Sequence, residues 1–346
     1  MSSSYRDLHY AQRPAKNIER KMIVESLAGL DRVVSATSAQ YVGFGSIYFT
    51  DFLLVHRRLG LTDMLSIEKD SSDHQRKRVD FNRPFAGVEV RHGRASEHLP
   101  TLTWEGQKIV WLDYDGQLDS EILDDVETVV RSATDTTVLI VTVNARPDEI
   151  PEPPPASDVE GAPKPTTLLT ETTVRVDALC SRVGGRVPKE ITKDAQLGGW
   201  KLADVSLRLL NESIGRTLAT RNLVVGAPAR STRQPVADAS TNPDPLVWTQ
   251  VMHFRYSDNA KMLTLGGVVH RKSLEADLAD CHLETKEWTR TAAQQPFEIA
   301  VPRLTTREVL ALDRLLPDEL PENEYVNGGA VLRAITLWVK DLGDTA

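Results

Sequence analysis

Residues 39–49 read AQYVGFGSIYF, and this stretch indicates the fold class. An extended run ends in two closely spaced glycines, Gly43 and Gly45, and a strongly apolar segment follows at 47–59. That order is typical of a strand, a tight glycine-rich turn and a helix. Glycine lets such a turn adopt backbone angles that other residues resist, and it lets a ligand approach closely. In a doubly wound sheet, a nucleotide-like ligand sits at this first turn.

Further strand-like runs follow the turn. The run at 63–68 ends in Glu68, which stands 23 positions after Gly45 (68 − 45), close to the ~20 expected of a carboxylate that binds a ribose hydroxyl. Runs at 88–95 and 108–115 come next, and 137–144 is an almost unbroken β-branched run, typical of a parallel strand buried on both faces. The helical period at 117–133 supplies a crossover of the kind that parallel neighbours need.

The last pair of strand-like runs predicts a hairpin, because residues 246–256 and 262–269 flank a turn at 257–260. The predicted fold is α/β: a Rossmann-like mixed sheet of parallel strands with an antiparallel edge hairpin, helices on both faces, and an inserted helical region. Four segments follow from this reading: an N-terminal helical segment (1–34), the Rossmann-like core (35–145), a Pro-rich loop with a helical insertion (146–245), and the edge hairpin with C-terminal helices (246–346). We expect the insertion to lie beside or over the ligand site and to decide which acceptor substrate binds there.

Composition narrows the function classes. The 346 residues carry a net charge of −8, so we expect no extended nucleic-acid surface. Cys180 and Cys281 lie far apart without a Cys/His cluster, which argues against a zinc site and fits a reducing compartment. No uninterrupted apolar run reaches ~18 residues, so we expect no transmembrane helix. We therefore expect a cytoplasmic protein with no membrane partner, and a protein partner stays open.

A helix is predicted at 15–30, where apolar residues recur at helical spacing. Its other side carries the charged residues Lys16, Glu19, Arg20 and Lys21. The simpler interpretation is a solvated amphipathic helix. The alternative is that its cations, with Lys16 and Arg20 foremost, bind an anionic substrate across the mouth of the site.

These runs resemble the class I S-adenosylmethionine-dependent methyltransferases, and more narrowly bacterial O-methyltransferases, over residues 35–145 and in the hairpin near 246–269. In that family the glycine-rich turn lies under the amino-acid part of the cofactor, the acid ending the second strand holds the ribose hydroxyls, and a residue pair after the third strand contacts the adenine. The end of the fourth strand faces the reacting centre. The resemblance therefore implies S-adenosylmethionine as cofactor, with nine binding residues: Tyr41, Gly43, Phe44, Gly45, Glu68, Arg94, Ala95, Asp113 and Tyr114.

Three positions depart from the family pattern. Ile47 replaces the third glycine, Tyr41 stands where an acid is usual, and Arg94 stands where the family has Asp. Two function classes stay open for this reason. The first is an active S-adenosylmethionine-dependent methyltransferase with an unassigned acceptor, and the second is a catalytically silent Rossmann-like module that binds a nucleotide or a protein.

Methyl transfer depends mainly on positioning, and a general base can remove the acceptor's proton. Asp113 and Asp115, at the end of the fourth strand, are the candidate catalytic residues. Lys16, Arg20 and Asn144 are the candidate substrate-binding residues. Carboxylates at i and i+2 could also share a hard cation, but we assign no metal and favour roles in positioning.

Overall fold

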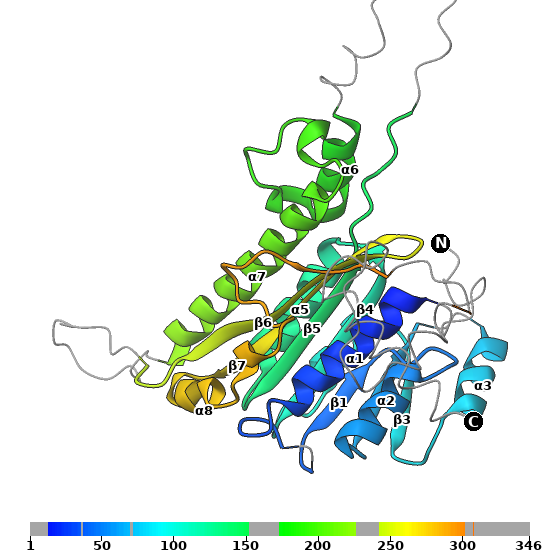
Figure 1. Ribbon diagram of the computed structural model, residues 1–346, viewed down its shortest axis with the longest axis vertical. Coiled ribbons are helices and arrows are strands. Elements are labelled where there is room, and N and C mark those ends of the chain that lie inside the picture. The colour runs from blue at the N-terminus through cyan, green and yellow to red at the C-terminus, as the bar shows by residue number, and fades with distance from the viewer. Residues whose placement is uncertain are drawn as a thin grey trace, which may run out of the picture.

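The computed structural model describes residues 13–35, 37–69, 72–151, 173–225, 242–301 and 307. Within these residues, eight strands form one sheet in the order β3–β2–β1–β4–β5–β7–β6–β8 (Figure 1). The strands are β1 (Gln40–Gly43), β2 (Met64–Glu68), β3 (Val88–His92), β4 (Lys108–Gln117), β5 (Thr137–Asn144), β6 (Leu246–Ser257), β7 (Lys261–Arg271) and β8 (Phe297–Ile299). Neighbours from β3 to β5 run parallel, whereas β7 runs antiparallel to β5 and β6. The predicted mixed α/β sheet is confirmed.

The helices lie between these strands in the chain. They are α1 (Pro14–Ala28), α2 (Thr50–Leu59), α3 (Asp73–Asn82), α4 (Ala95–His98), α5 (Ser120–Ser132), α6 (Val174–Val183), α7 (Lys201–Val225) and α8 (Glu275–Ala279). Short 3-10 turns occur at Leu99–Thr101, Gly184–Arg186, Asp194–Gln196, Lys272–Leu274 and Leu283–Thr285. The C-terminal helices expected from the sequence lie outside the described residues. No helix in the described part of the chain is both long and apolar enough to cross a membrane.

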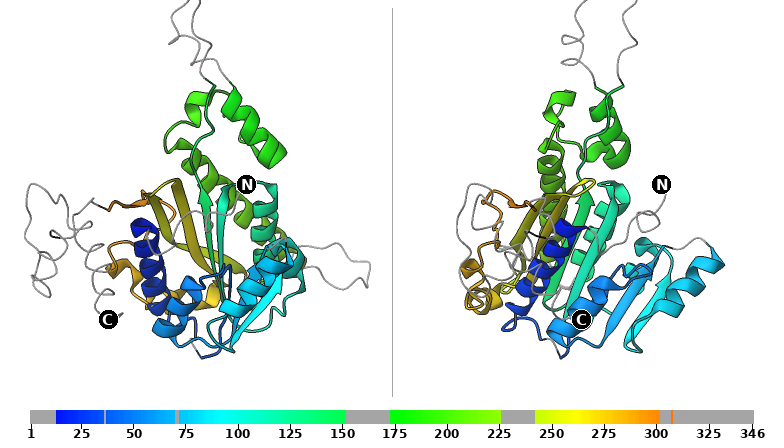
Figure 2. Two further views of the ribbon diagram at one scale, coloured as in Figure 1. Left: turned by 90° about the vertical axis from the view of Figure 1, so that its right-hand side faces the viewer. Right: turned by 45° about the vertical axis from the view of Figure 1, so that its right-hand side comes forward.

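The central strands are buried on both faces, as their apolar composition predicts. In β4, Ile109 and Trp111 pack toward α1 and α2, whereas Val110 and Leu112 pack toward α5 and α7, and each of the four is at most 2% exposed. Side chains alternate across a strand, so one run of apolar residues serves both cores. Figure 2 shows α1 and α7 on opposite faces of the sheet.

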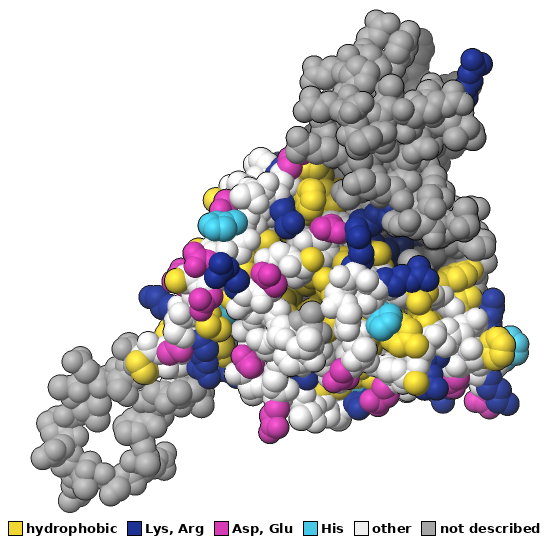
Figure 3. All heavy atoms as spheres, turned by 60° about the horizontal axis from the view of Figure 1, so that its bottom comes forward, with side chains coloured by type: hydrophobic (Ala, Val, Ile, Leu, Met, Phe, Trp, Pro, Cys, Tyr) yellow, Lys and Arg dark blue, Asp and Glu magenta, His cyan; other side chains and the backbone are white. Residues whose placement is uncertain are grey.

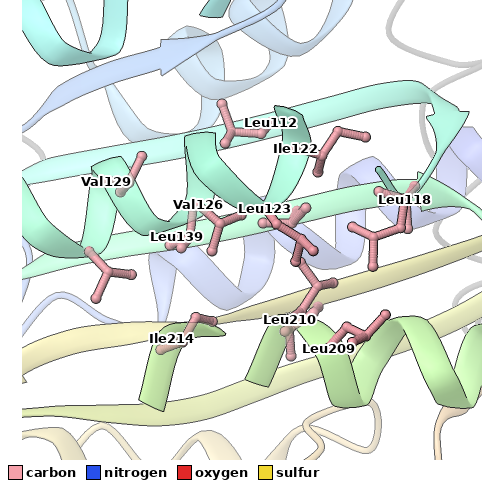
Figure 4. Packing of buried hydrophobic residues seen from close by; sticks show 14 of the residues in the cluster. Leu112, Leu118, Ile122, Leu123, Val126, Val129, Leu139, Leu209, Leu210 and Ile214 are labelled. Carbon is pink, nitrogen blue, oxygen red and sulfur yellow. The ribbon is translucent and has the colours of Figure 1, made fainter. Parts of the chain in front are cut away.

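One of these cores joins α5, α7 and the sheet. Leu123 and Val126 of α5 meet Leu139 of β5, and Leu210 and Ile214 of α7 close the cluster (Figure 4). All five side chains are fully buried, and burial of a side chain this size contributes roughly 1.5–3 kcal/mol. Helix α7 is therefore a layer of the sheet domain.

The region 146–245 is thus divided in the structure. Helix α7 covers the sheet, whereas α6 lies near the chain that leaves β5, where Arg182 binds the Asp148 carboxylate at 2.9 and 3.0 Å. Residues 152–172 and 226–241 lie outside the described residues. The role of this region in acceptor specificity stays a prediction.

The hairpin joins the main sheet, as predicted. Val141 of β5 pairs with Leu265 of β7 in an antiparallel ladder that runs the length of β5. The short apolar run near residue 298 adds a strand that the sequence did not reveal, because Phe297 of β8 pairs in parallel with Phe254 of β6. A run this short cannot show the alternation of buried and exposed residues that is typical of a strand. It is recognisable as a strand only from its pairing with β6.

The start of helix α2 was predicted wrongly at residue 47. The helix begins at Thr50, and residues 46–49 form a turn. Its buried residues are Asp51, Phe52 and Val55, on one face. The basic residues at its end face outward.

Charges of both signs mix on the surface. On the face turned to the viewer in Figure 3, Lys and Arg side chains are interspersed with Asp and Glu among the described residues. Such a face creates no strong field of one sign.

Candidate functional site

The glycine-rich turn closes on the acid that ends β2. The backbone N–H groups of Gly45 and Ser46 donate to Oε1 of Glu68 at 2.7 and 3.0 Å. The Ser66 hydroxyl donates to the same oxygen at 2.5 Å and accepts from the Gly45 N–H at 2.9 Å. The carboxylate therefore fixes the shape of the turn, and Ser66 is a member of the site that sequence reasoning missed.

Glu68 is 7% exposed and is therefore not a surface acid. Its backbone carbonyl accepts the N–H of Gly93, which joins the ends of β2 and β3. Parallel strands bring their carboxyl ends to one edge, and this pairing places Glu68 beside the turn that precedes Arg94.

The strained backbone of the turn falls on residues other than its glycines. Ser46 and Phe49 have φ angles of 51° and 48°, in the left-handed region, whereas neither Gly43 nor Gly45 does. Gly45 is needed for space, because a Cβ there would lie 2.5 Å from the Phe49 ring. Ile47 is 6% exposed and packs in the core beneath α1 and α2. Its replacement of a third glycine therefore leaves the turn intact.

A buried ion triad lies on the α1 side of β4. The Lys16 ammonium is 2.6 Å from Oδ1 of Asp113 and 2.8 Å from Oε2 of Glu19. The three side chains are 3%, 9% and 0% exposed, respectively. The solvated interpretation of the charged side of α1 is therefore wrong. Two residues predicted separately, Lys16 and Asp113, form one ion pair, and Glu19 joins them unpredicted.

Polar and aromatic groups surround the triad. The Thr264 hydroxyl donates to Oε1 of Glu19. The Lys16 ammonium lies over the rings of Trp111 and Tyr256, at 5.4 and 6.0 Å from their centroids. The spacing of Lys16 and Glu19 at i and i+3 put both on one side of a helix, which was the signal available in the sequence.

Burial and charge oppose each other in the triad. Burial lowers the pKa of Lys16, but the charges of Asp113 and Glu19 outweigh it, so that the pKa stands well above its ordinary value. Burial raises the pKa of Glu19, and Lys16 offsets part of that rise. The lysine is therefore charged, while Glu19 is the group that binds a proton more readily than usual.

A second buried pair stands next to the triad. Arg20 binds the Asp51 carboxylate of α2, and the Arg20 side chain is 1% exposed. Tyr41 is also 1% exposed, and its ring meets Phe52 edge-on with centroids 4.9 Å apart. Burial and then the Asp51 charge raise the pKa of Tyr41 well above its ordinary value. Arg20 and Tyr41 therefore lie in the core next to the triad and support it from there.

Phe44 and Tyr114 lie on the face of the sheet opposite to the triad. Their rings meet edge-on with centroids 5.2 Å apart. The Tyr114 hydroxyl donates to Oδ2 of Asp125 on α5 at 2.7 Å. Phe44 follows β1 and Tyr114 lies in β4, so two of the predicted cofactor residues are neighbours.

The remaining predicted residues lie at the rim. Arg94 binds Glu121 at 2.9 and 3.0 Å and is half exposed, whereas its neighbour Ala95 is buried. Asp115 is exposed, and Oδ1 of Asn144 accepts the Arg146 N–H at 2.8 Å. Among the described residues, no group of three or more His, Cys, Asp or Glu stands within reach of one metal ion.

Known proteins resemble this chain over most of its length. Residues 8–334 match the model of a family described as "Putative O-methyltransferase". The structure of M. jannaschii TYW2 in complex with AdoMet is 10% identical, with 78% of this chain and 80% of that chain covered and a TM-score of 0.35. A Klebsiella pneumoniae structure titled as a putative O-methyltransferase is 13% identical, with 75% and 89% covered and a TM-score of 0.35. Cofactor-bound Rv0187 from MTB is 12% identical, with 75% and 87% covered and a TM-score of 0.33. Among curated proteins, none matches the sequence.

Proposed function

Because the chain belongs to the family described as "Putative O-methyltransferase", we propose that it transfers a methyl group from S-adenosylmethionine to an oxygen of an acceptor molecule. One observation carries the cofactor assignment beyond family membership. The acid that ends β2 is held at the carboxyl edge of the sheet by the turn that follows β1. That is the edge at which open α/β sheets bind their ligands.

The residues at this edge fit the cofactor's chemistry. The Glu68 carboxylate is an acceptor for ribose hydroxyls, in charge-assisted hydrogen bonds. Phe44, Ala95 and Tyr114 offer apolar surface for an adenine ring, and Gly43 keeps the end of β1 free of a side chain. When bound, S-adenosylmethionine supplies a methyl group made electrophilic by a positively charged sulfur.

The chain's own residues then orient the acceptor and take its proton. Asp113 begins the accessible part of β4 beside Lys16, and we assign it as the base. Lys16 and Asn144 remain our candidates for the acceptor side, whereas Arg20, buried against Asp51, acts only from the core beside Lys16. Asp115 is a second candidate base. The alternative of a silent module rested on departures from the family pattern at Ile47, Tyr41 and Arg94, and the burial of Ile47 in the core accounts for the first of them.

We place the activity in the bacterial cytoplasm. Cys180 and Cys281 are both free, which suits a reducing compartment. The acceptor is a molecule with a hydroxyl or carboxyl group that can reach the carboxyl edge of the sheet.

Calorimetric titration with S-adenosylmethionine and S-adenosylhomocysteine tests the proposal. The parent protein should bind both. Glu68→Ala should lose roughly 1.5–3 kcal/mol of binding, the range for a hydrogen bond to a charged group. That loss is about tenfold to hundredfold in affinity.

Glu89→Gln is the matched control, because Glu89 is an exposed acid on the neighbouring strand. It should bind like the parent. Because Glu68 also holds the turn, the thermal unfolding of each variant is measured as well. Glu68→Gln, which keeps the shape of the side chain, is the second variant. A parent protein that binds neither compound would refute the cofactor assignment.

A further inference from the structure

The triad of Lys16, Asp113 and Glu19 has one carboxylate more than it has ammonium groups. With all three ionised it carries a charge of −1, and its members are at most 9% exposed. A buried charge is costly unless it is paired. The triad therefore gains by taking up one proton.

The geometry marks the atom that would hold this proton. Oε1 of Glu19 already accepts the Thr264 hydroxyl. Oε2 is buried 2.8 Å from the Lys16 ammonium, within reach of one of its protons. An acceptor atom in this position has room for a proton of its own.

The other titratable groups around the triad come from four elements. Arg20 follows Glu19 on α1, Asp51 faces the triad from α2, Tyr41 from β1 and Tyr256 from β6. Arg20 and Asp51 neutralise each other as an ion pair. Burial raises the pKa of both tyrosines well above its ordinary value, so they stay neutral. The surplus charge therefore belongs to the two carboxylates on Lys16.

We propose that Glu19, acting through Lys16, is the final holder of the proton that the acceptor loses during methyl transfer. This inference rests on the proposed function. Asp113 is the most exposed of the three and is the group that meets the acceptor, whereas Glu19 is fully buried and can act only through its neighbours.

The proton balance closes within the chain. As the oxygen–methyl bond forms, the sulfur–methyl bond breaks and its electron pair stays on sulfur, while the acceptor's O–H proton passes to Asp113. Lys16 gives one of its own three protons to Oε2 of Glu19 and, with the lone pair this frees, takes the proton from Asp113. The triad goes from −1 to 0, and its lysine is an ammonium before and after. Return of the proton to solvent through Asp113 resets the site.

Infrared spectroscopy of the parent protein tests this without any acceptor. A protonated carboxyl group gives a carbonyl band that a carboxylate lacks, and its intensity is followed over a pH series. The parent should show a band whose intensity falls as the pH rises. Glu19→Gln should lose the part of this band that comes from Glu19, seen in the parent-minus-variant difference spectrum, because Asp125 contributes a band of its own. Glu19→Asp, which keeps a carboxyl group, should retain a band in the corresponding difference from Glu19→Gln.

Glu25→Gln is the control, since Glu25 is a more exposed acid on the same helix, paired with Arg58 at 2.9 Å. It should keep the parent's band. A parent spectrum that Glu19→Gln leaves unchanged overturns the proposal.

Turnover gives a second readout, measured with radiolabelled S-adenosylmethionine and a panel of phenols, alcohols and carboxylic acids. For any acceptor methylated, Glu19→Gln should lower kcat by about 100-fold, with the KM for S-adenosylmethionine unchanged, as for loss of an acid–base contribution. Equal kcat and equal pH profiles in parent and variant would refute the relay. A parent that binds no S-adenosylhomocysteine would instead refute the proposed function, so the two failures are distinguishable.

Discussion

The pKa of Asp125 makes the stability of the protein depend on pH. It is 2% exposed, and it accepts the Tyr114 hydroxyl. Burial raises its pKa to about 6, although the Tyr114 hydrogen bond acts in the opposite direction. The folded pKa lies above the unfolded value of about 3.9, so the folded state binds more protons between about pH 4 and pH 6. Asp125 therefore costs stability as the pH rises through that window.

Asp125→Asn should remove this cost and keep an acceptor for Tyr114. We expect the variant to be more stable than the parent at neutral pH, by on the order of 1–2 kcal/mol, with the difference vanishing below about pH 4. Urea unfolding over a pH series measures it. Asp124→Asn, at an exposed acid paired with Arg186, is the control and should follow the parent. If the gap between Asp125→Asn and the parent does not change with pH, the Asp125 carboxyl is not its source.

At the scale of elements, α1 is held by a residue far away in the chain. Its N-cap residue, Arg13, makes no side-chain cap. Instead Asp258, in the turn between β6 and β7, accepts the N–H groups of Ala15 and Lys16 at 3.2 and 3.1 Å. A carboxylate at this end also complements the helix dipole.

Asp258→Ala should cost about 1 kcal/mol of stability, within the roughly 0.5–2 kcal/mol range for loss of a helix cap. It should also loosen the end of α1 that carries Lys16. Chemical denaturation gives the first effect, and faster amide exchange in residues 15–19 gives the second. Asn259→Ala, at an exposed position of the same turn, should do neither. An Asp258→Ala protein as stable as the parent would show that α1 needs no cap from this turn.

Elements were predictable from the sequence to the extent that they have a period. The apolar spacing around Ile18 and Met22 predicted α1, and β5 was predicted at its observed bounds. The partners of polar residues have no such signal. The sequence at Lys16 and Glu19 would be the same whether this side of the helix faced water or a buried aspartate. Only the packing of α1 on β4 decides between the two environments.

At the scale of the whole molecule, the sheet should exchange its amide hydrogens in a graded way. β1, β4 and β5 are hydrogen bonded on both edges and covered on both faces, so they should be the slowest. β3 and β8 end the described sheet and should be the fastest. Added S-adenosylhomocysteine should slow exchange at residues 43–49. Mass-detected hydrogen exchange measures all three, and uniform exchange across the sheet would contradict the expected order.

The overall architecture could be predicted because parallel strands buried on both faces are continuous apolar runs. The place of Glu68 at a strand end came from its offset from Gly45. The shape of the turn could not be predicted, since its left-handed residues are Ser46 and Phe49, which carry no marker of that conformation. Their backbone is fixed by the Glu68 carboxylate and by the packing of α2, and both are tertiary contacts.

The cap on α1 also has a consequence for how the chain is made. The ribosome delivers Ala15 and Lys16 early, but Asp258 follows 243 residues after Ala15. Strand β4, which carries Asp113, also emerges well after α1. Until then the nascent helix has neither its cap nor the Asp113 partner of Lys16, and a lone helix of 15 residues is marginal in water. Helix α1 therefore gains its cap only after translation has passed the hairpin of β6 and β7, so this part of the fold is completed late.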